Sequence, residues 1–504
     1  MEHSVGSRIR RLPGFARRCV GLLFALVPVV APLRAEESGR PPNILFISID
    51  DLRPELGAYG GQAITPHLDR LADRGLRFDR AYATQAVCGP SRLSVMAGLY
   101  PERTGLRRHD VKGWRERIGD VPTLNAWLGE HGYTTIGLGK VFHERDYEGA
   151  DGPNWTLWID TEQEHYLLPE SLRERQENRR EGKKVRGPST ESADLADVAY
   201  VDGKRAMMGA AILDQLGGNA PGPLSRSERE KPFFLAVGFQ KPHLPFVAPR
   251  RYWEPYDRAS LSLPEERGLP PGYPPAAANP RPGELYNYAD IPRNDLPVDF
   301  PEALERRLFH GYLAATSYAD ANAGVLLEAL ERNGLAENTI VIVWGDHGFK
   351  LGEHGSWTKH TNLEIDNRVP LLVYSPGHPE AVGSTAALVE LIDLYPTVCD
   401  WIGLPVPPHV QGRSFAKLLA DPEGEHRESA YSSFPVPHPD AFKMGHSIRT
   451  RHHRYTEWWD GRDRRVESVL TNLEVDPGET TAVDDPSQET AHSEILRRRV
   501  LEAR

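Results

Sequence analysis

NILFISI, residues Asn43–Ile49, is a continuous apolar run that is followed directly by two carboxylates, Asp50 and Asp51. A run of this length and composition is typical of a strand that is buried on both faces of a parallel sheet. Ligands of such sheets bind beyond the carboxyl ends of the strands. The sequence therefore predicts a functional site at the end of this strand.

Further apolar runs alternate with helical segments after this strand. We expect strands over Thr134–Leu138, Phe233–Phe239, Thr339–Trp344 and Pro370–Tyr374, and helices from Pro66 to about Arg74, over Leu124–Glu130 and over Gly311–Arg332. This alternation predicts an α/β domain in which helices cover both faces of a mostly parallel sheet. The strand pattern weakens after Gly412, so we expect a large domain over residues 41–425 and a smaller C-terminal domain over residues 426–504.

The composition excludes several classes of protein. Of the 504 residues, 39% are hydrophobic and 26% are charged, so the chain can bury a core and is not disordered. The absence of an internal repeat argues against solenoids and propellers. Two stretches resemble insertions: residues 162–186 are highly charged, and residues 263–301 contain ten prolines. We expect the second to be an ordered loop that borders a cleft, although solvated surface explains both stretches as well.

The first 35 residues have the charged, apolar and cleavable order of a secretory signal. Arg8–Arg18 is basic, Cys19–Leu33 is an apolar run of 15 residues, and small residues follow up to Ala35. A membrane span needs about 20 apolar residues, so an uncleaved anchor is the weaker alternative. We therefore expect an exported protein, periplasmic or secreted, without stable membrane insertion.

The formal charge of the chain is −11. Without the first 35 residues, which hold six arginines and one acid, 54 basic and 70 acidic residues remain, and the charge becomes −16. Such an acidic chain is a poor general binder of nucleic acid or anionic lipid, so we expect no nucleic-acid partner. An anionic substrate would need a local cluster of basic side chains.

Two cysteines remain after the signal segment, Cys88 and Cys399, and they do not form a disulfide framework. Cys399 lies in an apolar, helical-looking stretch and is interpreted as a small buried hydrophobe. Cys88 begins the stretch CGPSR ahead of a helical segment, where backbone N–H groups favour an anion. It is therefore a candidate nucleophile with Arg92 one turn further on, unless it is a chance cysteine in a loop.

Carboxylates at strand ends suggest a divalent cation. Asp50 and Asp51 cannot be buried unpaired, and a hard cation would satisfy them, although a strand-end cap is the alternative. Asp346 and His347 follow the strand that is expected over Thr339–Trp344. If the two strands are parallel neighbours, three carboxylates and one imidazole meet around one cation.

Basic residues follow three of the apolar or loop segments. They are Lys140 and His143, Lys241 and His243, and Lys359. Isolated lysines and histidines are usually surface residues or satisfied core residues. Several such sites in an acidic chain fit a pocket for an anion better.

Residues 88–92 resemble the C-x-P-S-R signature of the sulfatase family, whose cysteine is oxidised to formylglycine. The order of the motifs is also similar to that family: Asp-Asp, then C-x-P-S-R about forty residues later, Gly-Lys with a nearby His, Lys-Pro-His and Asp-His-Gly. GKVFH, KPHLPF and DHGFKLGEHGSWTKH resemble the iduronate-2-sulfatase branch, and DLYPTVCDWIGLP with QGRS is similar to sulfatases in general. The resemblance covers roughly residues 42–480.

The resemblance implies an alkaline-phosphatase-like large domain and a short antiparallel sheet in the smaller domain. It also implies one Ca²⁺ per chain and a 3-oxoalanine (formylglycine) that a formylglycine-generating enzyme makes from Cys88. Carried over by position, the residues that would hold the cation with the modified Cys88 are Asp50, Asp51, Asp346 and His347. His347 is a nitrogen ligand where many sulfatases have Asn, and the iduronate-type branch shares it.

The other matched residues would act on the sulfate. Arg92 would fix the formylglycine, and the residues that would surround the sulfate are Lys140, His143, His243 and Lys359. The hydrated aldehyde would attack sulfur, with His243 as general acid for the leaving alkoxide and His143 as the base that lets sulfate leave. Lys241 belongs to the same motif as His243 and is a weaker candidate.

The implied activity is hydrolysis of a sulfate ester on a carbohydrate, with a 2-O-sulfated uronic acid or another sulfated polysaccharide unit as substrate. His109, Lys112 and Arg115 are candidate contacts for a sugar carboxylate, although surface positions explain them as well. Two alternatives stay open. One is a phosphatase or phosphonate monoester hydrolase on the same scaffold. The other is an inactive, carbohydrate-binding descendant, in which Trp458 and Trp459 could offer a stacking surface.

Overall fold

The computed structural model describes residues 40–108, 111–144, 147–161, 164–183, 185–265, 267–279, 283–293, 300–438 and 441–504. The expected signal segment, residues 1–35, and the sugar-contact candidate His109 lie outside the described residues. None of the helices in the described part combines the length and the apolar character that a membrane span requires.

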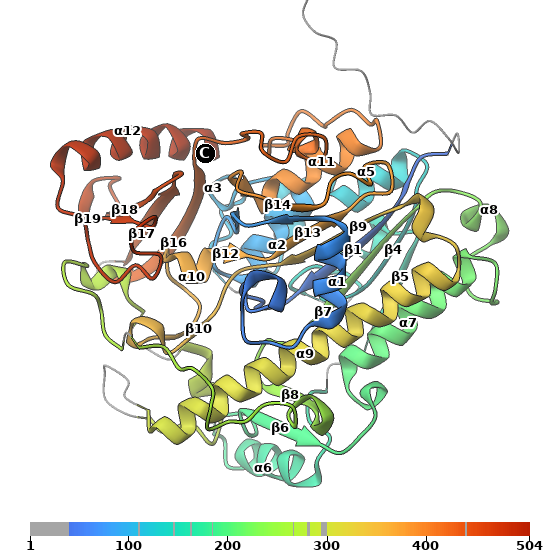
Figure 1. Ribbon diagram of the computed structural model, residues 1–504, viewed down its shortest axis with the longest axis horizontal. Coiled ribbons are helices and arrows are strands. Elements are labelled where there is room, and N and C mark those ends of the chain that lie inside the picture. Colours follow the sequence, from blue (N-terminus) through green and yellow to red (C-terminus); the bar gives the residue numbers. More distant parts are fainter. Residues whose placement is uncertain are drawn as a thin grey trace, which may run out of the picture. The chain divides into compact units, whose positions relative to one another are not determined.

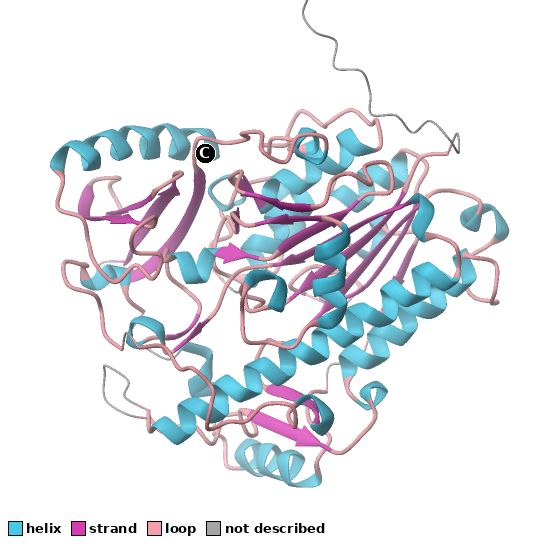
Figure 2. Ribbon diagram, in the orientation of Figure 1, coloured by secondary structure: helices cyan, strands magenta, loops and turns pink. Residues whose placement is uncertain are grey.

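An eight-stranded sheet forms the centre of the fold, in the order β14-β2-β13-β9-β1-β7-β4-β5 (Figure 1, Figure 2). β1 (Asn43–Ile49) lies between β7 (Phe233–Phe239) and β9 (Thr339–Gly345) and is parallel to both. β4 (Thr134–Gly139) is parallel to β7. β13 (Leu371–Tyr374) is antiparallel to β9, so the sheet is mixed. The four central strands, β9, β1, β7 and β4, run in one direction as expected.

Helices cover both faces of this sheet. On one face, α1 (Pro66–Arg74), α7 (Val201–Leu216) and α9 (Glu302–Arg332) pack their apolar side chains against Leu45, Ile47 and Ile49 of β1. α9 begins at Glu302 rather than at the expected Gly311. Its charged first turns hide the buried Leu308 and Phe309, which the sequence pattern alone did not reveal.

The opposite face is covered by α2 (Cys88–Ala97), α5 (Leu124–Glu130) and α11 (Leu394–Trp401). Arg92 of α2 donates a hydrogen bond to Ser48 of β1, whose side chain points away from Ile47 and Ile49. α2 thus begins against the end of the central strand, and this contact places its first residue beside Asp50 and Asp51.

The C-terminal part is an antiparallel sheet covered by one helix. Its strands are β16 (Ala430–His438), β17 (Ala441–Arg449), β18 (His453–Trp459) and β19 (Arg465–Asn472), and its helix is α12 (Pro486–Ala503). Trp458 and Trp459 are only 1% and 8% exposed. The idea that they offer a stacking surface for a sugar is therefore wrong, because both indoles pack inside the protein.

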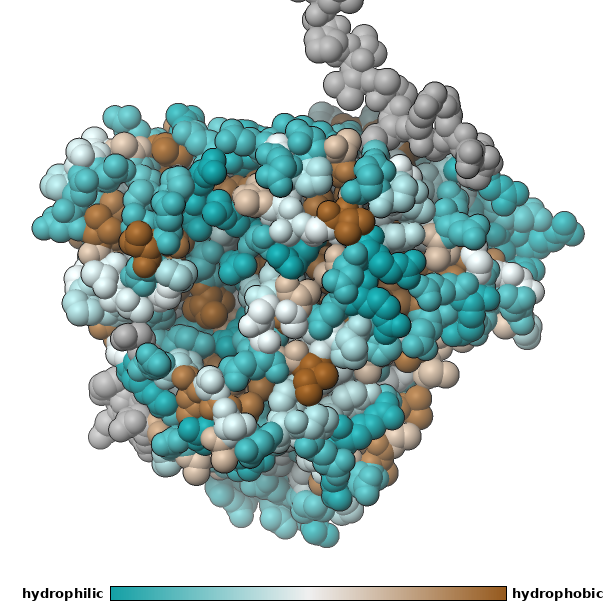
Figure 3. All heavy atoms as spheres, in the orientation of Figure 1, coloured by the Kyte–Doolittle hydropathy of each residue, from teal (hydrophilic) through white to brown (hydrophobic). Residues whose placement is uncertain are grey.

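Short elements complete the fold. The strands are β2 (Leu76–Phe78), β3 (Ala81–Tyr82), β5 (Leu157–Ile159), β6 (Thr190–Ala193), β8 (Phe246–Pro249), β10 (Lys350–Leu351), β11 (Trp357–Thr358), β12 (Arg368–Val369), β14 (Gly383–Thr385) and β15 (Val389–Glu390). The helices are α3 (Pro101–Thr104), α4 (Trp114–Ile118), α6 (Pro169–Arg180), α8 (Arg226–Arg229) and α10 (Glu364–Asn367). Figure 3 shows hydrophobic residues scattered among hydrophilic ones on the visible face, as is normal for a folded protein surface.

Arg499 ties α12 to the larger part of the fold. Its guanidinium donates a hydrogen bond to Tyr100 Oη at 2.9 Å and forms an ion pair with the fully buried Glu390. We expect Arg499→Met to lower the free energy of unfolding by about 3 kcal/mol, because it leaves a buried carboxylate with fewer partners. Arg498→Met removes an exposed ion pair with Glu428, and this variant should change the free energy of unfolding by less than about 0.5 kcal/mol. Urea denaturation of both variants tests the difference, and equal effects would contradict it.

Candidate active site

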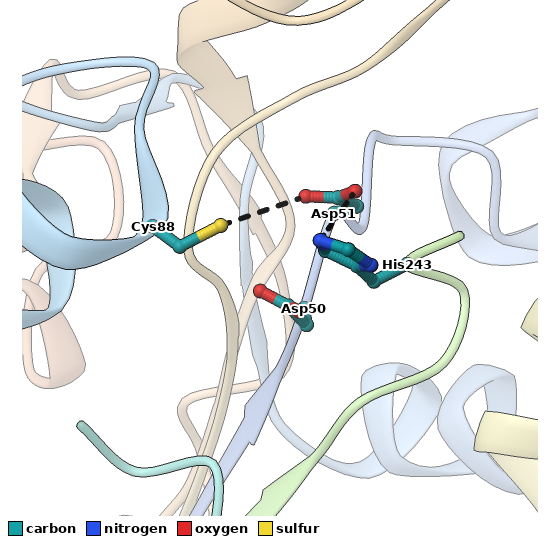
Figure 4. A group of neighbouring side chains, drawn as sticks. All are labelled: Asp50, Asp51, Cys88 and His243. Carbon is teal, nitrogen blue, oxygen red and sulfur yellow. Dashed lines mark hydrogen bonds and ion pairs between the residues drawn. The ribbon is translucent and has the colours of Figure 1, made fainter. Parts of the chain in front are cut away.

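The candidate residues lie at the carboxyl ends of four neighbouring parallel strands. The residues that follow these strands are Asp50 and Asp51 after β1, Asp346 and His347 after β9, Lys140 after β4, and His243 in the loop after β7. The strand order therefore delivers all of them to one place, as the sequence predicts. Figure 4 shows Asp50 and Asp51 at the end of β1, with Cys88 and His243 pointing toward them from a helix and a loop.

Cys88 is the first residue of α2, and its side chain is buried. Its sulfur lies 3.1 Å from Nε2 of His347, 3.5 Å from Nζ of Lys359 and 3.9 Å from Oδ1 of Asp51. The start of the helix adds partial positive charge at the same point. Cys399 is also buried, but it lies within α11 away from these groups, and burial raises the pKa of its thiol to about 12.

Arg92 holds two of the carboxylates in place. Its Nε lies 2.9 Å from Oδ2 of Asp346 and its Nη2 lies 3.2 Å from Oδ1 of Asp50. The same guanidinium donates to Oγ of Ser48 and to the backbone carbonyl of Lys140. Because Arg92 is fully buried and planar, it fixes the relative position of the ends of β1, β4 and β9.

One buried oxygen of Asp51 receives no hydrogen bond from the part of the chain that the structure describes. Its backbone is in the left-handed region with φ of 59°, and its N–H donates to Oδ1 of Asp346 at 3.0 Å. Lys359 Nζ lies 2.7 Å from Oδ1, whereas Oδ2 has no hydrogen-bond partner among the described residues. Burial raises the pKa of Asp51 well above its usual value, although the charge of Lys359 opposes this. An unsatisfied buried carboxylate oxygen is costly, and a cation would satisfy it.

His347 is held with its Nε2 toward this cluster. Its Nδ1 lies 2.9 Å from the carbonyl oxygen of Gly348, and its Nε2 lies 3.4 Å from Oδ1 of Asp51. Burial alone would lower the pKa of His347, but the charges of Asp346 and Cys88 outweigh it and raise that pKa to about 10. The negative surroundings of His347 thus favour a positive charge at this place.

The donor atoms are close enough together to hold one cation. Two overlapping groups each have their ligand atoms within 4.8 Å of one another: Asp50, Asp51, Cys88 and His243 in the first, and Asp50, Cys88, Asp346 and His347 in the second. A hard divalent cation prefers carboxylate oxygens, and the unsatisfied oxygen of Asp51 points to the same conclusion. The residues present therefore fit the divalent metal that the sequence predicts.

Lys140 and His143 lie on the β4 side of the cluster. Lys140 Nζ forms a buried ion pair with Asp50. Burial alone would raise the pKa of Asp50, but the positive charge of Lys140 outweighs burial and keeps that pKa well below its usual value. His143 is half-buried, and burial together with the charge of Lys140 lowers its pKa to about 4. A neutral imidazole near pH 7 can accept a proton.

The loop after β7 presents His243 and uses Lys241 to keep its own shape. His243 Nδ1 lies 2.6 Å from the carbonyl oxygen of Leu244, and Nε2 lies 4.0 Å from Oδ2 of Asp51. Lys241 Nζ donates instead to the carbonyl oxygens of His243 and Pro245. Lys241 therefore supports the loop that carries His243, which agrees with its lower rank as a candidate.

Glu284 lies near the cluster but was not among the candidates predicted from the sequence. Glu284, from the proline-rich stretch, lies 3.4 Å from Nε2 of His243 and 3.3 Å from Nζ of Lys359. The only signal was the expectation that this stretch borders a cleft. Arg115 makes an ion pair with Asp151 at 2.6 Å instead of joining the cluster, and Lys112 is an exposed residue.

The model for the family described as Sulfatase matches residues 42–404. The chain belongs to the sulfatase family. A second model, N-sulphoglucosamine sulphohydrolase, C-terminal, matches residues 352–504. The family resemblance that the motifs indicated is confirmed, and this sulfatase is a sulfuric ester hydrolase.

Two of the curated relatives of this sulfatase are iduronate 2-sulfatases. This sulfatase is 34% identical over 518 residues to iduronate 2-sulfatase from Homo sapiens, covering 87% of this chain and 89% of that one. It is 32% identical over 483 residues to iduronate 2-sulfatase from Mus musculus, covering 82% and 84% of the two chains. The resemblance to the iduronate-2-sulfatase branch therefore extends well beyond the motifs.

Solved structures confirm the fold. One neighbour was solved in complex with its substrate D-glucosamine-2-N,6-O-disulfate; it has a TM-score of 0.70 at 22% identity, covering 92% of this chain and 97% of that one. A phosphonate monoester hydrolase from Silicibacter pomeroyi has a TM-score of 0.67 at 22% identity, covering 91% and 94%. These likenesses support the alkaline-phosphatase-like large part with a smaller C-terminal antiparallel sheet, and at this identity they concern the fold alone.

Proposed function

We propose that this sulfatase removes the 2-O-sulfate from a uronic acid unit of a glycosaminoglycan or a related sulfated polysaccharide. The similarity to iduronate 2-sulfatases supports this substrate class. The observation that carries the proposal is the position of Cys88, whose sulfur lies within 3.9 Å of Asp51, His347 and Lys359 at the start of a buried helix. A phosphatase has no need of the C-x-P-S-R signal.

The proposed site has a modified cysteine and a cation. The residues that would hold Ca²⁺ with the modified Cys88 are Asp50, Asp51, Asp346 and His347. A formylglycine at position 88 would supply a hydrated aldehyde as nucleophile, and the cation would supply positive charge beside the sulfate oxygens. Arg92 then keeps Asp50 and Asp346 in position through the ion pairs described above.

The basic residues would bind the sulfate and move protons. The ammonium groups of Lys140 and Lys359 would bind sulfate oxygens and stabilise the charge that develops on them. Burial lowers the pKa of His243 well below its usual value, and the negative charge of a bound sulfate ester would raise it, so that a protonated Nε2 would give its proton to the oxygen of the leaving sugar. The imidazole of His143 would then take a proton from the second oxygen at position 88, which lets sulfate leave and restores the aldehyde.

The basic, apolar and small-residue order of residues 1–35 supports export of the protein. We propose that residues 1–35 are a signal peptide, that residues 41–425 and 426–504 are the catalytic and C-terminal domains, and that the protein is periplasmic or secreted. A formylglycine-generating enzyme would act on Cys88 during maturation. Comparing the N-terminus of the protein from whole cells and from the exported fraction tests the cleavage.

Sulfated oligosaccharides test the substrate class. With a panel of 2-O-, 6-O- and N-sulfated units, we expect kcat/KM for a terminal 2-O-sulfated uronic acid to exceed the others by at least about 100-fold, because sugar contacts are used in the transition state. Phosphate and phosphonate monoesters serve as the comparison. Faster turnover of these esters than of any sulfate ester would overturn the proposed function in favour of a phosphatase or a phosphonate monoester hydrolase.

A further inference from the structure

Glu284 reaches the active site from outside the strand ends. It lies in the 3-10 helix η6 (Gly283–Asn287), within the proline-rich stretch. A Cβ at Gly283, whose φ is +49°, would lie 2.6 Å from Oγ1 of Thr358. Gly283 thus lets the loop backbone lie directly against β11, and this close approach brings the next side chain beside Lys359.

The carboxylate of Glu284 contacts two of the groups that would bind and cleave the ester. Its Oε2 lies 3.3 Å from Nζ of Lys359 and 3.4 Å from Nε2 of His243. Lys359 Nζ is itself 3.5 Å from the sulfur of Cys88. Glu284 is therefore separated from the reacting position by a single side chain. It belongs to neither of the two groups of described residues that could hold a metal.

A carboxylate in a pocket for an anion opposes the binding of that anion. The opposition grows with the charge of the ligand, since Coulomb energy is proportional to the product of the charges. A sulfate ester carries one negative charge, whereas a phosphate monoester carries close to two at neutral pH because its second pKa is about 6. Inorganic sulfate, the product, also carries two.

We propose that Glu284 is a specificity residue that acts as a charge filter, lowering the affinity of the site for dianions relative to the monoanionic sulfate ester. This inference rests on the proposed sulfatase site. Glu284 favours sulfate esters over phosphate esters that have the same shape, and it promotes release of inorganic sulfate after the reaction.

Methyl sulfate and methyl phosphate form a matched pair of probes. Isothermal titration of each into the calcium-loaded full chain at about pH 8 compares a monoanion with a dianion, since the second pKa of a phosphate monoester is about 6. We expect Glu284→Gln to lower Kd for methyl phosphate at least about tenfold and for methyl sulfate less than about threefold. At about pH 5, where methyl phosphate carries one charge, the two ligands should respond alike.

The control is Glu302→Gln, which removes the same charge from a side chain that is 65% exposed on α9, and it should leave both Kd values unchanged. An equal change for the two ligands at about pH 8, or weaker binding of both, would overturn the charge filter and leave the sulfatase proposal standing. If neither ligand binds to either protein, the anion pocket is refuted, and the proposed function fails with it.

Discussion

Cys88→Ala is expected to reduce kcat/KM for the best sulfate ester by at least about 10⁴-fold, which is a typical cost of removing a covalent nucleophile. The fold should survive, because a buried cysteine that becomes alanine loses one atom beside a cluster of polar groups rather than a large apolar side chain. Activity is measured on the substrate that the oligosaccharide panel selects, and circular dichroism checks the fold.

Cys399→Ala is the matched control, since Cys399 is also a buried cysteine but lies in α11 away from the cluster. It should keep wild-type kcat/KM. Mass spectrometry of the tryptic segment 81–92 (AYATQAVCGPSR) adds an independent readout. Conversion of Cys88 to formylglycine replaces the thiol by a carbonyl with a fixed loss of mass. Full activity in a protein whose segment carries only unmodified cysteine would disprove the proposed nucleophile.

The central strands could be predicted because they are buried on both faces. β1 and β7 have the bounds expected from their apolar runs, and β4 and β9 differ by one residue. The direction of β13 could not be predicted, because its four apolar residues fit a parallel and an antiparallel neighbour equally well. The start of α9 was hidden by its charged first turns.

The part of the active-site cluster that follows the ends of the parallel strands could be predicted from the sequence. Carboxylates after β1 and β9 meet because these strands are parallel neighbours. Glu284 could not be found in this way, because its stretch has neither a helical nor a strand period. Its contact with Lys359 depends on how the loop backbone lies against Thr358, which only the three-dimensional structure reveals.

Asp346→Asn should remove the cation and the activity together. Oδ1 of Asp346 accepts hydrogen bonds from the backbone N–H groups of Asp51 and His347, and Oδ2 accepts one from Arg92. An amide cannot accept on its nitrogen side, and it removes one of three carboxylate charges, so both the geometry and the attraction for a divalent cation are weakened. We expect metal content to fall from about one Ca²⁺ per chain to nearly zero and kcat/KM to fall at least about 10³-fold.

A chelator should reproduce this loss in the wild-type enzyme, with recovery when Ca²⁺ is added, whereas the variant should not recover at the same concentration. Asp393→Asn is the control, because Asp393 is an equally buried carboxylate that pairs with Arg427 instead of the cluster. It should lower thermal stability and leave metal content unchanged. Metal analysis of the wild type, Asp346→Asn and Asp393→Asn is the deciding measurement: one calcium per chain in Asp346→Asn would contradict the proposed role of Asp346 as a ligand of the cation.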